Sequence, residues 1–87
     1  MPGKLAAVIT DPGSKGVDSV AFSPDGRMLA AGDQNGRAYL WAARTGALVA
    51  TLATSDRSGV VATAFSPGGD TLATGQQDGS LNIWNLD

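Results

Sequence analysis

The chain repeats itself at a fixed distance of 43 residues, and this feature constrains its fold more than any other. Residues 1–44 align with residues 44–87 without a gap, and 16 of the 44 aligned pairs are identical. The identical pairs include Phe22 and Phe65, Gly32 and Gly75, and Trp41 and Trp84. Repeats of this kind hide their apolar faces against their neighbours, so we expect the two units to stack.

Each repeat is predicted to consist of short β-strands separated by turns. Apolar and β-branched stretches alternate with turn sequences such as Ser23–Gly26 and Gln34–Gly36. Recurring Gly and Pro and the absence of Glu argue against helices. The expected strands are residues 16–23, 28–32, 37–42 and 47–53 of the first repeat, and 60–66, 71–75 and 80–86 of the second.

Two ordered sets of residues carry a resemblance to a known family. They are Val20–Gly26, Leu29–Gly32 and Tyr39–Trp41 in the first copy, and Ala64–Gly69, Leu72–Gly75, Gln77–Gly79 and Asn82–Asn85 in the second. This pattern resembles the WD40 β-propeller family, which implies an all-β fold with two four-stranded antiparallel blades per chain. The chain departs from the family in having Trp41-Ala42 and Trp84-Asn85 in place of Trp-Asp, and in having no His.

The resemblance also assigns structural roles within each blade. Family blades often carry a buried His–Asp–Ser/Thr–Trp network, of which the second copy retains Thr74, Asp78 and Trp84. A half-satisfied buried network is costly, so we expect Asp78 to face its own hairpin turn or solvent. The residues of the predicted blade signature are Phe22, Trp41, Phe65, Thr74, Asp78 and Trp84. The repeated positions of the aromatic residues favour packing between blades over a platform for ligand stacking.

Two blades cannot close a propeller ring, which needs about four to eight. The second repeat lacks its fourth strand, and the copy of that strand lies in residues 4–10. We expect residues 4–10 of one chain to pair beside residues 80–86 of another, in a cyclic homo-oligomer with head-to-tail contacts. The residues predicted to make this strand exchange are Leu5, Ala7, Ile9, Leu81 and Ile83. We favour a homotetramer with eight blades, with a homotrimer as the alternative.

Composition excludes most catalytic and nucleic-acid functions. The chain has no His and no Cys, so it has neither a His-based triad nor a thiolate metal site. Its net charge of −2 argues against nucleic-acid binding. We expect no enzymatic activity, no cofactor and no metal. Copies of Asp18 would gather at the channel mouth of a ring, where a bound hard cation is the minority alternative to a solvated acid.

We therefore expect a non-catalytic module that assembles with itself and serves as a protein-interaction scaffold for an unknown partner. The alternative is a small-ligand or sugar-binding propeller with sites at blade interfaces or loops. No apolar run approaches about 18 residues, so we expect no membrane partner and a cytoplasmic location. The chain begins and ends at complementary strand positions, as expected of a two-repeat piece of a longer propeller or of an engineered protein.

Overall fold

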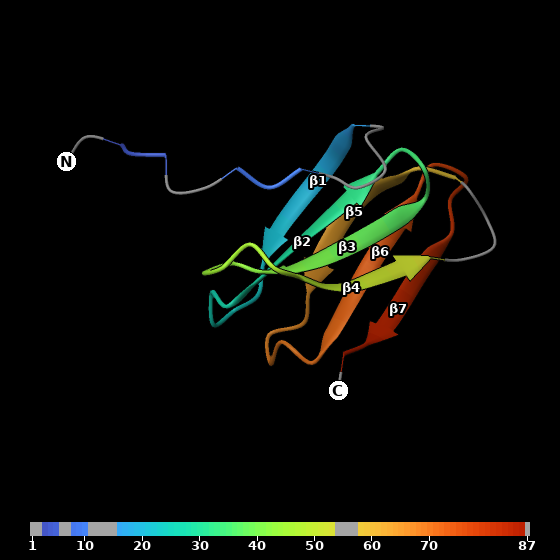
Figure 1. Cartoon of the computed structure of the whole chain (residues 1–87). Helices are drawn as coiled ribbons and strands as arrows, with labels where there is room; N and C mark the ends of the chain where they lie inside the picture. Colours follow the sequence, from blue (N-terminus) through green and yellow to red (C-terminus); the bar gives the residue numbers. More distant parts are fainter. Residues whose placement is uncertain (1–2, 6–7, 11–15, 54–57, 87) are drawn as a thin grey trace.

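Seven strands in the described part of the chain form two antiparallel sheets (Figure 1). The structure, a computed structural model, describes residues 3–5, 8–10, 16–53 and 58–86. The first sheet has the order β1-β2-β3-β4, and the second has the order β5-β6-β7. The strands are β1 (Val17–Phe22), β2 (Met28–Asp33), β3 (Arg37–Ala42), β4 (Leu48–Ala53), β5 (Val60–Phe65), β6 (Thr71–Gln76) and β7 (Leu81–Asn85).

The two sheets repeat each other in detail. All seven strands agree with the predicted ranges to within one residue at each end. The first strand pair of each sheet has a register irregularity at the same place, Val17/Ser19 in one and Val60/Ala62 in the other. The turn that follows closes in both sheets on a glycine with positive φ, +75° at Gly26 and +79° at Gly69. The structure thus confirms an all-β fold built on the 43-residue repeat.

The predicted outer strand at residues 4–10 is not observed as a strand within this chain. Residues 3–5 and 8–10 have no strand pairing, and Ala7 lies outside the described residues. Ile9 instead packs against a cluster of the first sheet formed by Ala31, Tyr39 and Trp41. This cluster lies on the face of the first sheet that points away from the second sheet, and the partner expected for residues 4–10 is β7 of another chain. The two-sheet chain therefore has one complete four-stranded blade and one three-stranded blade.

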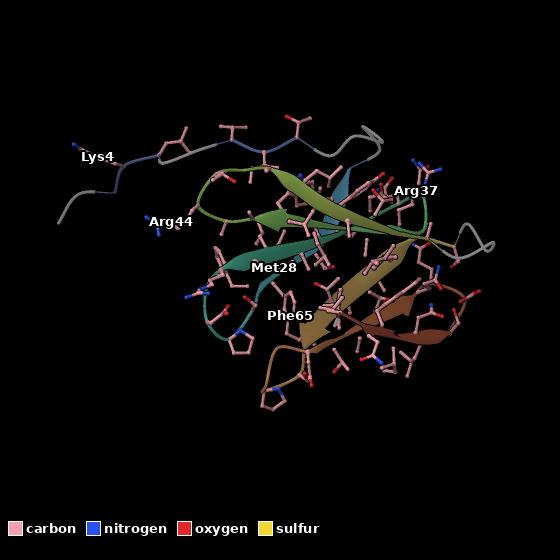
Figure 2. The ribbon with its side chains drawn as sticks, turned by 60° about the horizontal axis from the view of Figure 1, so that its bottom comes forward. Lys4, Met28, Arg37, Arg44 and Phe65 are labelled. Carbon is pink, nitrogen blue, oxygen red and sulfur yellow. The ribbon has the colours of Figure 1, made fainter. Side chains whose placement is uncertain are left out.

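The two sheets pack face to face through apolar residues, and we call this contact the joint. Ala30, Leu40 and Leu72 are its buried core, and Met28, Ala50, Leu52, Phe65, Trp84 and Leu86 pack around them. A Cβ atom added at Gly32 would collide with the side chain of Val60, which is 2% exposed. The missing side chain at Gly32 therefore lets the two sheets come this close. In Figure 2, Met28 and Phe65 lie on opposite sides of the joint, one on each sheet.

Each sheet also has a face that points away from the joint. The first outer face consists of Val20, Phe22, Leu29, Ala31, Tyr39 and Trp41. The second outer face consists of Ala62, Ala73, Gly75, Leu81 and Ile83. Tyr39 and Trp41 cover each other, with ring centroids 5.7 Å apart. Phe22 and Ile83, in contrast, are 64% and 71% exposed, so neither outer face is fully covered.

The joint predicts a position-specific effect of adding one methyl group. Gly32→Ala would place a Cβ against Val60 and within 3.0 Å of the Ser19 hydroxyl, so the sheets must separate or shift. We expect the free energy of unfolding, measured by urea denaturation, to fall by about 1–3 kcal/mol. Gly68→Ala is the control, because its added Cβ has only Asp70 nearby, at 3.8 Å. Equal stability of the two variants would contradict this account of the joint.

Candidate functional site

The blade signature residues are brought together only in part. The Trp84 indole N–H donates a hydrogen bond to the Thr74 hydroxyl at 3.1 Å, and Thr74 is 2% exposed. Asp78 does not join this pair. Its carboxylate accepts hydrogen bonds from the backbone N–H and the hydroxyl of Ser80, so it faces its own hairpin turn. In the first sheet Ala31 stands where Thr74 does, and Trp41 packs on Tyr39 instead.

A second polar network surrounds Gln76 at the end of β6, and sequence analysis did not predict it. Gln76 is 5% exposed, and its amide N–H donates to the Ser58 carbonyl at 2.7 Å. Its carbonyl oxygen accepts from the Asn82 amide at 2.8 Å and lies 2.9 Å from the Ser80 hydroxyl, whose proton it shares with the Asp78 carboxylate. The available signal was position: Gln76 continues the alternation of buried residues along β6. These bonds tie three segments of one blade together and offer no reactive group.

Two acidic residues, Asp25 and Asp33, stabilise turns of the first sheet. Asp33 is 1% exposed, and its carboxylate accepts the backbone N–H groups of Asn35 and Arg37. Asp25 accepts the Ser23 hydroxyl at 2.6 Å and the Arg27 backbone N–H at 3.0 Å. These hydrogen bonds, the one from Ser23 first, lower the pKa of Asp25 below its ordinary value, because they stabilise the charged form. Such carboxylates stabilise turns and are poor general acids.

Among residues 3–5, 8–10, 16–53 and 58–86, no group of three or more metal-ligating side chains comes together. No helix in these ranges is long and apolar enough to cross a membrane. Asp18, the candidate for a cation at a channel mouth, is exposed on β1. What stands out in the described molecule is exposed apolar surface.

The residues predicted for strand exchange lie on opposite sides of the chain. Leu81 and Ile83 are 78% and 71% exposed on β7, which is an edge strand of its sheet. Leu5 is 82% exposed, and Ile9 covers part of the first outer face. These groups do not meet within one chain. Leu5, Leu81 and Ile83 therefore remain exposed in the single chain, whereas Ile9 is partly buried.

The two outer faces repeat the two sides of the joint. Displaced by 43 residues, Gly32 and Leu40 of the joint correspond to Gly75 and Ile83 of the second outer face. On the other side of the joint, Val60, Phe65, Leu72 and Trp84 correspond to Val17, Phe22, Leu29 and Trp41. Val60 is 2% exposed whereas Val17 is 47% exposed. The chain thus contains one joint, and its two outer faces have the same kinds of residues as the two sides of that joint.

Comparison with known families agrees with this repeat. The sequence matches the WD40 family, described as "WD domain, G-beta repeat", over residues 3–42 and 46–85. These two ranges are related by the same displacement of 43 residues: the second begins just before the outer strand β4, and the first begins with the corresponding segment ahead of β1. The chain belongs to the WD40 repeat family. WD40 repeat domains are typically non-catalytic and generally serve as scaffolds for protein interactions.

A solved structure supports the same fold. The chain is similar to Kluyveromyces lactis Hsv2, with a TM-score of 0.77 and 22% sequence identity over 85% of this chain. The match covers 24% of the Hsv2 chain, so this chain spans about a quarter of that structure. At this identity the likeness shows the propeller fold alone. No curated protein matches the sequence.

The Trp84–Thr74 hydrogen bond predicts a difference between two substitutions at one site. Thr74→Val keeps the side-chain shape but leaves the Trp84 N–H without its acceptor, which should lower the free energy of unfolding by about 1–3 kcal/mol. Thr74→Ser retains the hydroxyl and is expected to retain more of the stability. Urea denaturation followed by tryptophan fluorescence measures both variants. If the Val variant is as stable as the Ser variant, the hydrogen bond does not stabilise the blade.

Proposed function

We propose that this chain is a non-catalytic WD40 module that self-assembles head to tail into a closed ring, which then serves as a scaffold for protein partners. Four chains give eight blades and three give six, and we favour four. The observation that carries the proposal is the match between the outer faces and the joint. A second copy can cover each outer face with the kind of surface that already covers its counterpart inside the chain.

The fit can be followed residue by residue. In the joint, Val60 occupies the space left by Gly32, and Phe65 packs beside Leu72. Between two chains, Val17 of one would occupy the space at Gly75 of the next. Phe22, now 64% exposed, would pack as Phe65 does. The contact is heterologous, and such contacts form rings when the rotation between copies closes.

Strand exchange would complete the three-stranded blade. The pairing of β3 with β4 places Leu52 opposite Ala38 and Leu48 opposite Trp41. Displaced by the repeat, the same register places Ile9 of a second copy opposite Leu81, and Leu5 opposite Trp84. The connection has the right length as well, because residues 54–59 join β4 to β5 and the corresponding residues 11–16 precede β1. Pairing also removes an open strand edge.

A small-ligand or sugar-binding propeller is the second candidate. It would place its site at a blade interface, where a cavity of about 610 Å³ does lie. The cavity lining is mostly apolar, with Met28, Leu52 and Phe65 among its residues. Sugars need several convergent polar groups, which this lining supplies only through Ser23, Asp25 and Asn85 together with backbone atoms. The lining therefore favours an apolar occupant.

The assembled mass tests the ring. Light scattering should give about 35 kDa for four chains of 8.8 kDa, or about 26 kDa for three. Gly75→Ala should abolish the assembly, because its Cβ would meet Val17 of the next chain as a Cβ at Gly32 meets Val60. Within one chain the added Cβ makes only ordinary contacts, 3.4 Å from Leu81 and 3.8 Å from Ala62. An 8.8 kDa species at micromolar concentration would refute the ring.

Engineered disulfides test the exchanged strand, because the chain has no Cys of its own. Ile9→Cys combined with Leu81→Cys places two sulfurs on directly opposite residues, so mild oxidation should link each chain to the next. Val8→Cys combined with Leu81→Cys is the matched control, because a shift of one residue turns the thiol to the other face. Non-reducing gel electrophoresis reads the result. Equal linkage in both variants would argue against this register.

A further inference from the structure

The face-to-face contact does not fill all of the space between the two sheets, and a groove remains. It has a volume of about 610 Å³ and lies beside the β1–β2 and β5–β6 turns. Its apolar lining includes Met28 and Phe65, which lie on the two sides of the joint in Figure 2. Val49, Ala50 and Leu52 of β4 line it from the first sheet, and Leu86 lines it from the end of the second.

The groove borders the position of the missing strand. In the first sheet, β4 is the outer strand, and its Ala50 and Leu52 pack into the joint. The second sheet has no outer strand to set against them, so the space between β4 and the end of β7 stays open. A fourth strand beside β7 would lie along this opening.

We infer that residues 4–10 of a second copy of this chain occupy the groove, with the side chains of Leu5 and Val8 directed into it. This inference rests on the proposed strand exchange and names its anchors. The register of β3 and β4 places Leu5 opposite Trp84 and Val8 opposite Asn82. Trp84 packs into the joint, and Asn82 bonds to the buried Gln76, so both face the first sheet. Residues directly opposite each other in an antiparallel pair point to the same face of the sheet. Leu5 and Val8 of the second copy therefore also face the first sheet of the chain whose β7 they pair with.

The chemistry of the segment fits the groove. Leu5 and Val8 are 82% and 76% exposed in the single chain, and both are aliphatic. The side chains that line the groove from β4 are aliphatic too. Burial of both groups removes apolar surface from water on the two sides of the contact at once. The backbone of the segment would pair with the edge of β7, which fixes the depth at which the two anchors enter.

The inference is tested by removing side-chain volume at Leu5 of the occupant and adding it at Ala50 of the groove. Leu5→Ala empties the anchor position and should raise the protein concentration at which half the assembly dissociates by at least about tenfold. Ala50→Leu extends a side chain into the groove and should weaken assembly in the same way, because it excludes Leu5. The double variant Leu5→Ala with Ala50→Leu should recover much of the affinity, because the new leucine fills the space. Sedimentation velocity across a dilution series measures each midpoint.

Controls separate this inference from the ring itself. Leu5→Met keeps an apolar side chain of similar volume and should assemble like the parent chain. Leu5 is exposed in the single chain, so substitutions there leave the fold intact, and circular dichroism checks this for Ala50→Leu. If the parent chain forms a ring and neither single variant changes its midpoint, the groove inference is overturned and the ring stands. If the parent chain never assembles, the proposed function fails, and the groove inference fails with it.

Discussion

The close approach of one sheet to the next at Gly32 and Val60 is the constraint on which the rest of the structure depends. At this point of contact there is room for small residues only, so Gly32 lies against Val60, while larger side chains such as Leu40 and Leu72 fill the rest of the joint. Small residues contribute little apolar area each, so burial on one face cannot stabilise a blade well. Each blade needs a neighbour on both faces, and in a chain of two blades the two outer faces have no neighbouring blade.

The two blades are stabilised by different kinds of side-chain contact. The second uses polar side chains: Trp84 bonds to Thr74, and the buried Gln76 links Ser58 to Asn82. The first has Ala31 at the Thr74 position and uses an aromatic pair instead, Tyr39 on Trp41. The polar contacts connect β6 to β7, whereas Tyr39 and Trp41 both lie on β3. The polar contacts of the second blade lie on its joint face, and the aromatic pair of the first blade lies on its outer face.

The sequence predicts the local structure well because local structure depends on neighbours in the chain. Turn residues such as Gly26 and Gly69, and the alternation along β6, specify strands to within a residue. Contacts across longer distances were harder to foresee. The Gln76 network depends on Ser58, which is 18 residues away and lies in another segment. Residues 4–10 read as a strand because they copy β4, but a strand forms only where an edge is available to pair with.

Ile9 shows how the same segment relates the single chain to the ring. In the single chain it covers Ala31, Tyr39 and Trp41, which belong to the first outer face. In the ring that face would be covered by the second outer face of a neighbour, and Ile9 would lie opposite Leu81 of that neighbour. The two placements agree, because Ile9 corresponds to Leu52, which packs into the joint beside Leu72 and Trp84, the counterparts of Leu29 and Trp41. The contact of Ile9 with Trp41 is therefore the counterpart of a contact inside the joint, and the proposed ring would retain it while residues 4–10 pair with β7 of the neighbour.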